Sequence, residues 1–526
     1  NAQLGSDKDP HGGLIYRLYA HFLSLALRLR VLTVTLLVGV TAACAWGFTF
    51  VSQSFFPDSN TPMFYVNYEL PRGSDIRATR RDAERIETYL LDKAGVEAVS
   101  TFIGRGATRF MLTYAPEQPD PAYAQFIVRA ESLERIAELD SEVYAELQAF
   151  FPEARVRTQR IQFGPGTGAQ IEARFHGSDP VVLRRLADEA KEIMRGNPAL
   201  IDIRQDWREQ ETVVAPQFNE ERARIAGVSR DELAQTLQFA SSGVRAGTYR
   251  EGDSLIPIIA RPPENERRNV SRLADRMVWS SAEQRFIPIA QIVDGFATES
   301  QEALIHRRNR VRTLTVQADP AEGYTANAAF STVRGAIEDM TLPPGYALTW
   351  GGEYENSSDA QESLARQLPL SFVAMLVVSI LLFGKLRQPL IIWLVVPMSI
   401  CGVVIGLLLT GLPFSFTALL GMLSLSGMLM KNAIVLVDEI DAQIKTGKER
   451  LSALLDASTS RLRPVTLAAG TTILGMLPLL FDAFFNSMAV TIMGGLAFAS
   501  LLTLIAVPVF YSLLFAIPGH ESQRQD

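Results

Sequence analysis

The sequence predicts a membrane protein that combines a bundle of six membrane-spanning helices with a large α+β domain. Three observations carry this prediction. Charged residues crowd the middle of the 526-residue chain, whereas both of its ends are strongly apolar. Six apolar stretches approach or exceed the length needed to cross about 30 Å of hydrocarbon. Between the first and the second of these stretches, strand–helix–strand patterns recur.

The apolar stretches are the predicted spans. The first, Val31–Phe50, contains no charged residue and is too long and too far from the start for a signal-peptide core. The other five are Leu368–Phe383, Leu390–Leu412, Phe416–Val437, Val465–Phe481 and Met488–Phe515. Residues 14–29 indicate an amphipathic helix lying along the membrane face. A simple continuation of the first span is the alternative for these residues.

Basic residues in the short loops predict the orientation of the spans. They occur before the first span, between the second and third, and between the fourth and fifth, for example Arg17, Arg28, Arg30, Lys385, Arg387, Lys445 and Arg450. The turns at 413–415 and 482–487 have none. We therefore expect both termini in the cytoplasm and the long loop after the first span outside it.

The long loop repeats a strand–helix–strand unit. Met63–Leu70 and Ile171–Phe175 alternate as strands, and Gly-Ser-Asp follows each of them, at 73–75 and 177–179. We expect each serine to cap a helix with the aspartate in its first turn, and Pro180 suits a first turn as well.

Two further units, Tyr123–Arg157 and Arg312–Trp350, resemble the first two in pattern. Four units predict two small α/β sandwiches of the ferredoxin-like kind. Residues 213–308 separate the third unit from the fourth and are expected to form an inserted subdomain. The alternative is that such units are common and unrelated.

Composition excludes several classes of function. The net charge is −7 and no basic stripe is interleaved with aromatic residues, so nothing favours nucleic acid. The two cysteines, Cys44 and Cys401, lie in apolar stretches and the histidines are scattered, so we expect no metal site and no other cofactor. No Walker lysine loop indicates ATP as an energy source.

The fourth span carries a lysine among apolar residues. Helical spacing places Ser424, Gly427, Lys431 and Asp438 on one face. Small and polar residues on one face predict that it points into the helix bundle. A carboxylate that pairs with Lys431 in one state and is protonated in another would act as a proton switch. The alternative is that the lysine side chain snorkels to the lipid headgroups. No other predicted span has an acidic residue near its centre that could pair with Lys431.

Several segments resemble the resistance–nodulation–division (RND) transporters, closest to the hydrophobe/amphiphile efflux, AcrB-like branch. Gly427–Glu439 is similar to the lysine-bearing tenth helix of that family, and Arg461-Leu-Arg-Pro464 to the start of its eleventh. Phe55-Phe-Pro57, Leu70-Pro-Arg-Gly73, Pro389–Met398 and Gly475-Met-Leu-Pro478 match other family segments. The resemblance extends in order from about residue 15 to 518.

The resemblance implies the carboxy-terminal half of an inner-membrane drug/proton antiporter rather than an enzyme. Its amino-terminal half would supply the acids that contact Lys431. Asn432, Asp438 and Arg461 would complete this relay region, whereas Ala468 stands where the family often has threonine. The family further implies a homotrimer with a periplasmic adaptor and an outer-membrane channel, driven by the proton motive force and embedded in membrane lipid.

The family organisation also assigns ranges to the loop. Residues 57–166 correspond to one porter subdomain, 167–212 together with 309–356 to the next, and 213–308 to a docking subdomain. Outside the loop, the family organisation assigns a cytoplasmic helix to 1–30, the first span to 31–50, the other five spans to 368–515 and a cytoplasmic tail to 516–526. Thr101–Gly106 resembles the glycine-rich switch loop.

The switch-loop resemblance implies that Phe102 and Arg105 contact hydrophobic or amphiphilic substrates, with Phe110 as a weaker candidate. A core position at the end of a strand is the alternative for Phe102. An exporter of lipids or envelope components, or a non-transporting sensor or assembly protein, are the alternatives for the whole chain.

Overall fold

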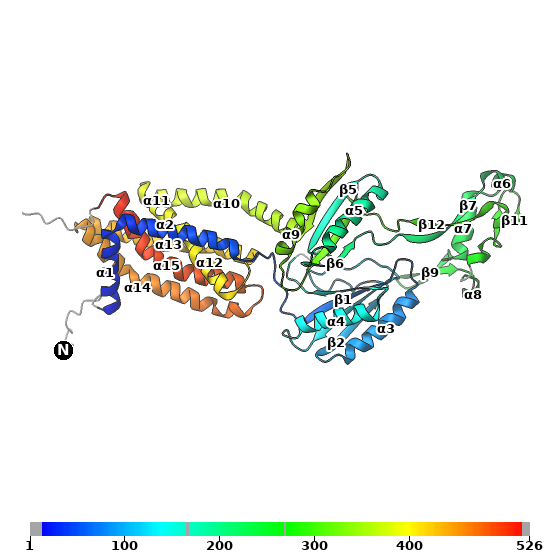
Figure 1. Cartoon of the computed structure of the whole chain (residues 1–526), viewed down its shortest axis with the longest axis horizontal. Coiled ribbons are helices and arrows are strands. Elements are labelled where there is room, and N and C mark those ends of the chain that lie inside the picture. Colours follow the sequence, from blue (N-terminus) through cyan, green and yellow to red (C-terminus); the bar gives the residue numbers. More distant parts are fainter. Residues whose placement is uncertain (1–12, 165–167, 268–269, 518–526) are drawn as a thin grey trace, which may run out of the picture. The chain divides into compact units, whose positions relative to one another are not determined.

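The computed structural model describes residues 13–164, 168–267 and 270–517 (Figure 1). Most of the expected tail at 516–526, the first twelve residues and part of the loop at 164–168 lie outside the described residues. The chain divides into two compact units. One comprises Asn1–Asp206 and His306–Asp526, and the other is Trp207–Ile305, which overlaps the insert expected at 213–308.

Six helical stretches in the described part are long and apolar enough to cross a membrane, and each overlaps one predicted span. They are α2 (Arg30–Gly47, continued by the turn Phe48–Phe50), α10 (Glu353–Phe383), α11 (Arg387–Val395) leading through Val396–Met398 into α12 (Ser399–Thr410), α13 (Phe416–Lys445), α14 (Arg450–Met476, continued by Leu477–Phe481) and α15 (Asn486–Leu514). Pro397 lies in the break between α11 and α12, because proline cannot donate the backbone hydrogen bond that a continuous helix requires.

The helices differ in how deeply they are buried. In the 18-residue apolar stretch of each span, 56%, 44% and 61% of the residues are buried in the spans that contain α12, α13 and α15, against 6%, 6% and 11% in those that contain α2, α10 and α14. The first three therefore form the centre of the bundle. Small residues let two of these helices approach closely, since a Cβ built on Gly402 of α12 would lie 2.2 Å from the carbonyl oxygen of Gly494 in α15.

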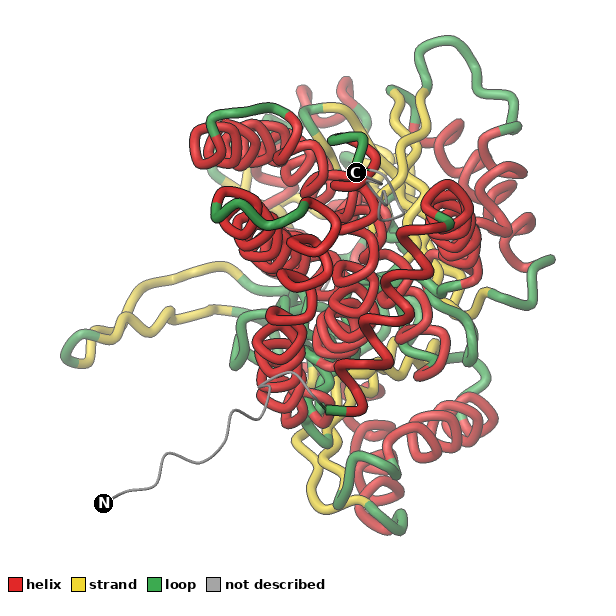
Figure 2. The backbone as a smooth tube through the Cα atoms, turned by 90° about the vertical axis from the view of Figure 1, so that its left-hand side faces the viewer, coloured by secondary structure: helices red, strands yellow, loops and turns green. Residues whose placement is uncertain are grey.

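The amphipathic segment forms a helix of its own. It is α1 (Leu14–Arg28), and Leu29 between α1 and α2 has a non-helical backbone with φ −101° and ψ 39°. Figure 1 shows α1 at a steep angle to α2, and Figure 2 views the bundle from the side on which α1 lies. The Tyr19 hydroxyl donates a 2.8 Å hydrogen bond to the carbonyl oxygen of Leu504, which attaches α1 to α15.

The first pair of repeats folds into one sandwich. Its elements are β1 (Met63–Glu69), α3 (Ile76–Asp92), β2 (Val96–Ile103), β3 (Tyr123–Ala130), α4 (Ile136–Phe150) and β4 (Arg155–Arg160). The strands pair antiparallel in the order β2-β3-β1-β4. Phe64, Val66 and Tyr68 alternate toward a core shared with α3 and α4, so the residues between them lie on the opposite face of the sheet.

The second pair of repeats has the same topology. Its elements are β5 (Ile171–Gly177), α5 (Pro180–Arg195), β6 (Leu200–Gln205), β14 (Val311–Pro320), α9 (Ala326–Glu338) and β15 (Ala347–Gly352), with a short β13 (Arg307–Arg308) at the edge. β14 pairs with β6 and β5, and β5 pairs with β15. Both sheets therefore place their four repeat strands in the order second, third, first, fourth. α10 begins directly after β15, at Glu353.

The predicted serine caps are wrong. Asp75 is the N-cap of α3 and accepts a hydrogen bond from the amide of Arg77, and Asp179 caps α5 through the amide of Val181. Ser74 instead donates to the carbonyl oxygen of Pro71, 2.6 Å away. The helices begin one residue later than expected because the extended backbone of each aspartate aims its carboxylate at the free amides. Pro180 occupies the first turn, as expected.

The unit Trp207–Ile305 has a small core of its own. Its elements are β7 (Glu211–Phe218), α6 (Glu220–Ile225), α7 (Arg230–Ala240), β8 (Val244–Glu251), β9 (Ser254–Ala260), α8 (Glu264–Arg267), β10 (Met277–Ser280), β11 (Arg285–Pro288) and β12 (Val293–Gln301). Val278, Ile287, Ile289 and Ile292 are buried together. A capping box at Ser229 and Glu232 starts α7.

We expect Asp206 to make folding stability depend on pH. Burial raises its pKa to about 6, although it accepts a 2.8 Å hydrogen bond from the amide of Thr315 and lies near His306. The folded state therefore holds this proton more tightly than the unfolded chain, and its contribution to stability is lost as pH rises from about 4 to about 6. Between about pH 4 and pH 6, the free energy of unfolding of the parent chain should fall by about 2–3 kcal/mol relative to that of Asp206→Asn.

The measurement is thermal unfolding of both proteins in detergent at pH 4.5 and pH 7. The difference between their midpoints should change with pH. The side-chain oxygen of asparagine can still accept the hydrogen bond from Thr315, but asparagine does not titrate. Midpoints that shift in parallel would contradict this assignment.

Candidate functional site

The charged stripe of α13 lies on an uncovered face of the helix. Ser424, Gly427, Lys431 and Asp438 are all exposed, whereas Leu425, Leu429 and Val437 on the opposite face are buried against the other helices. Among the helices described, none covers this stripe, and its orientation into a larger bundle stays a prediction. The apolar side of α13 takes the central position, because α12, α14 and α15 offer apolar partners to it.

Lys431 has no partner in the described part of the chain. It makes no hydrogen bond or ion pair there, and the same holds for Asn432 and Asp438. A Cβ built on Gly427, one turn away, would meet nothing within 4 Å. The stripe thus places a lysine, an amide and a carboxylate next to Gly427. Because glycine has no side chain, another helix could approach closely at this point.

Arg461 is paired, but not with the stripe. From α14 it donates from Nε to Oε2 of Glu439 at 3.1 Å, and its Nη2 donates to the same oxygen. Glu439 lies eight residues after Lys431, or about 12 Å along the helix. The structure therefore separates the predicted set into a paired arginine and an unpaired lysine. Thr471 and Thr472 both donate to the carbonyl oxygen of Ala468, so their hydroxyl groups are occupied within α14.

A second polar contact holds this end of the bundle together. Asp441 of α13 accepts a 3.0 Å hydrogen bond from Nε2 of Gln388 in α11 and another from the Tyr511 hydroxyl of α15. Sequence reasoning gave neither Glu439 nor Asp441 a partner, because it ended the span at Val437. The signal was present, since Asp438, Glu439 and Asp441 continue the same helical register to Lys445.

The residues proposed for substrate contact lie near one aromatic cluster. Phe102, one residue before the end of β2, is partly buried against a cluster that includes Tyr65 and Tyr114. Phe110 is exposed, with its ring centroid 5.0 Å from that of Tyr114. Arg105 is exposed and makes no hydrogen bond or ion pair among the described residues. The structure brings the two phenylalanines together around Tyr65 and Tyr114, with Arg105 on the adjoining loop.

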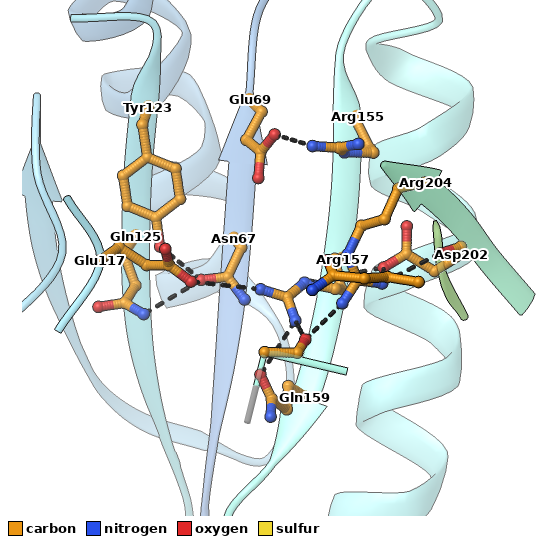
Figure 3. Close-up of polar contacts among 12 residues, drawn as sticks. Asn67, Glu69, Glu117, Tyr123, Gln125, Arg155, Arg157, Gln159, Asp202 and Arg204 are labelled. Atoms are coloured by element: carbon orange, nitrogen blue, oxygen red, sulfur yellow. Dashed lines mark hydrogen bonds and ion pairs between the residues drawn. The ribbon is translucent and has the colours of Figure 1, made fainter. Parts of the chain in front are cut away.

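A polar cavity of about 210 Å³ borders this cluster. It is lined by Tyr65, Asn67, Tyr114, Glu117, Gln125, Arg157, Gln159, Gln162 and Gly168, among others. The Asn67 side-chain oxygen accepts hydrogen bonds from the Tyr123 hydroxyl at 2.6 Å and from Gln125 at 3.1 Å. Figure 3 shows these groups projecting from one face of the sheet. Polar residues at alternate positions of β1 and β4 were the sequence signal for this face.

A larger cavity of about 650 Å³ lies where α10 leaves the second sandwich. Aromatic and aliphatic residues dominate its lining, including Phe48, Phe55, Phe330, Leu364, Leu368, Phe414, Phe416, Leu419 and Met422. Glu353, Ser357 and Gln361 provide polar groups on α10. An apolar space with a few polar groups suits an amphiphilic molecule.

Glu353 joins three segments beside this cavity. Its Oε1 accepts a 2.9 Å hydrogen bond from the amide of Phe55, and its own amide donates to the carbonyl oxygen of Gln170 at 2.8 Å. It thereby connects the segment after α2, the segment before β5 and the first turn of α10. Two hydrogen bonds of Glu353 thus tie the start of α10 to both of these segments.

We expect Glu353→Ala to expose the Phe55 amide. Loss of one buried hydrogen bond, worth about 1 kcal/mol, should speed hydrogen–deuterium exchange of that amide about five-fold. Glu353→Gln keeps the acceptor oxygen and should restore the parent rate. Mass spectrometry of the peptide that covers 51–58 measures this exchange. Equal rates in the alanine and glutamine variants would contradict the role given to the hydrogen bond.

Six apolar helices with a lysine inside one of them, joined to paired α/β sandwiches, are the arrangement that the RND resemblance implies. The chain belongs to the AcrB/AcrD/AcrF family, whose family model matches residues 13–515. Its fold is similar to that of a heavy metal efflux pump seen by X-ray crystallography, with a TM-score of 0.78 and 20% sequence identity over 96% of this chain and 53% of the other.

Curated relatives include both metal-resistance and multidrug proteins. The nickel and cobalt resistance protein CnrA of Cupriavidus metallidurans is 26% identical over 66% of this chain and 33% of its own length. The swarming motility protein SwrC of Bacillus subtilis is 22% identical over 98% of this chain and 49% of its own length. The multidrug export protein AcrF of Escherichia coli is 23% identical over 88% and 45%. The chain thus spans half or less of the length of these relatives.

Proposed function

We propose that this chain is the carboxy-terminal half of a proton-driven exporter of the bacterial inner membrane. The observation that carries the proposal is the uncovered stripe of α13. A lysine near the centre of a membrane helix costs roughly 2.5–3.5 kcal/mol unless it is paired, and Lys431 has no partner among the described residues. Acids on helices of an amino-terminal half would supply that partner.

Proton coupling follows from the charge on this face. An unprotonated carboxylate beside Lys431 would hold the facing helix by ion pairing, and protonation would release it. Each charge that crosses the membrane yields about 2.3 kcal/mol per 100 mV. That free energy would move the helices, and α10 would carry the movement through Glu353 into the sandwiches.

Hydrophobic or amphiphilic compounds, including drugs, are the substrates we propose. The apolar cavity beside α10 supports this class, because it joins an aromatic lining to a few polar groups. Phe102, Arg105 and Phe110 would contact the substrate further along its path. Homotrimeric assembly with a periplasmic adaptor and an outer-membrane channel is proposed on the family relationship alone.

Export of heavy-metal cations is the second candidate, favoured by the names of CnrA and of the structurally similar pump. Among the described residues, no group of three or more His, Cys, Asp or Glu side chains is placed to hold a metal ion. The aromatic and aliphatic lining of the cavity beside α10 gives the amphiphile proposal the stronger support.

The test is reconstitution of the full-length transporter in liposomes with an imposed proton gradient. An amphiphilic cationic dye and Co²⁺ serve as alternative substrates. We expect export of the dye that stops when the gradient is collapsed. Transport of Co²⁺ without the dye would overturn the substrate class, and dye export that ignores the gradient would overturn the coupling.

A further inference from the structure

Gln388 of α11, Asp441 of α13 and Tyr511 of α15 form a polar cluster at one end of the helix bundle. Asp441 is half-buried, whereas Gln388 is 2% and Tyr511 is 3% exposed. Nε2 of Gln388 donates a 3.0 Å hydrogen bond to Oδ2 of Asp441, and the Tyr511 hydroxyl donates to Oδ1. Each oxygen of this carboxylate thus accepts a hydrogen bond from a helix other than its own.

The side-chain amide of Gln388 uses only one of its two polar ends. Its Oε1 is buried and accepts no hydrogen bond within the part of the chain that the structure describes. The amide of glutamine carries an acceptor at one end and a donor at the other, and the two ends have nearly the same shape. A half-turn of the amide would therefore aim Oε1 at Asp441 in place of Nε2.

A proton on Asp441 would suit this second orientation of the amide. The carboxyl O–H of a protonated Asp441 would donate to Oε1 of Gln388, and the Tyr511 hydroxyl would still donate to Oδ1. The carboxyl group therefore keeps two hydrogen bonds whether it is charged or neutral. Because proton binding would break neither contact, the cluster can hold Asp441 in both protonation states.

The charges around Asp441 differ from those around Glu439, which lies two residues earlier. Glu439 is paired with Arg461 and also accepts a 3.0 Å hydrogen bond from Gln443, so protonation would break an ion pair there. Among the described residues, no cation forms an ion pair with Asp441. The charged groups on the helices packed here are Arg387 on α11, Asp438 and Lys445 on α13, and Arg450 on α14, near Tyr511.

We propose that Asp441 is a second proton-binding carboxyl of the transporter, separate from the carboxylates that would face Lys431. It lies ten residues after Lys431, about 15 Å along α13, and four residues before that helix ends. In the orientation that the basic loops predict, this end faces the cytoplasm. Asp441 would then be the last side chain to hold the proton before its release, a use that rests on the proposed function. Proton binding itself does not depend on transport.

The test is labelling of the full-length transporter in membranes with dicyclohexylcarbodiimide, which reacts with protonated carboxyl groups in apolar surroundings. Mass spectrometry measures the adduct at Asp441 and at Glu439, which serves as the matched control. We expect Asp441 to be labelled at least about ten times faster than Glu439 at pH 6, because the ion pair with Arg461 holds Glu439 charged. Labelling of Asp441 should slow as the pH rises. Labelling of Asp441 that is as slow as that of Glu439, or that ignores pH, would overturn the proposal.

Two substitutions should move the labelling of Asp441 in opposite directions. Tyr511→Phe keeps the ring that stacks on Phe515 but removes the hydroxyl that stabilises the charged carboxylate, so labelling should become about ten times faster at the same pH. Gln388→Lys replaces the amide with a cation that can donate but cannot accept, so labelling should become at least about ten times slower. Parent rates in both variants would overturn the proposal. Dye export that fails while Asp441 binds a proton as expected would count against the proposed function instead.

Discussion

Lys431→Ala should lower gradient-driven accumulation of substrate by the full-length transporter about forty-fold. The substitution removes the amine with which a carboxylate on the facing helix would form an ion pair. Protonation of that carboxylate would then no longer break a contact between the two helices. At 100 mV, loss of one coupled charge removes about 2.3 kcal/mol, which lowers the accumulation of substrate about forty-fold. The measurement is dye accumulation in liposomes under a fixed gradient.

Lys445→Ala is the control for this experiment. Lys445 is the last residue of α13 and lies beyond the stripe, fourteen positions and therefore about 21 Å from Lys431. Its loss should leave export within about two-fold, as expected for an exposed charge. Equal losses in the two variants, or full export by Lys431→Ala, would contradict the role of the stripe.

Gly402→Ala should strongly destabilise the helix bundle. A Cβ at this position would lie 2.2 Å from the carbonyl oxygen of Gly494 and 2.8 Å from the Cα of Gly495, so α12 and α15 would have to separate. Backbone atoms cannot move aside as a flexible side chain can. We expect a loss of about 3 kcal/mol in the free energy of unfolding, at the upper end of the usual range for overpacking.

Gly39→Ala tests whether that loss comes from the close approach. Gly39 lies in α2, and a Cβ built there would meet nothing within 4 Å. Unfolding of each variant in mixed detergent micelles, followed by circular dichroism, should show a lower midpoint for Gly402→Ala alone. A midpoint for Gly402→Ala equal to that of the parent would show that the helices tolerate separation.

Much of the architecture could be predicted because it depends on patterns within short stretches of the sequence. Apolar length located the six helices, and the repeated Gly-Ser-Asp at 73–75 and 177–179 located two helix starts and their flanking strands. The identity of the caps was not predicted correctly. Serine and aspartate are both good caps, and the choice between Ser74 and Asp75 depends on a one-residue shift in backbone conformation.

The site was predictable only in part, because its contacts join distant segments. The spacing of Ser424, Gly427 and Lys431 fixed which residues share a face of α13, but not which neighbour covers that face. The pairing of Arg461 with Glu439 depends on how α13 and α14 pack. The meeting of Gln388 and Tyr511 at Asp441 depends on how α11, α13 and α15 pack, which no local pattern encodes.

The most direct test of the account is zero-length carbodiimide cross-linking of the full-length transporter in membranes. This reagent joins an amine to a carboxylate only where the two are in contact. The account predicts a cross-linked peptide that contains Lys431 and an acidic residue from a span outside these 526 residues, and its loss in Lys431→Ala. Lys431 recovered without a cross-link, while Lys445 reacts with neighbouring acids, would contradict the claim that Lys431 forms part of a coupling site.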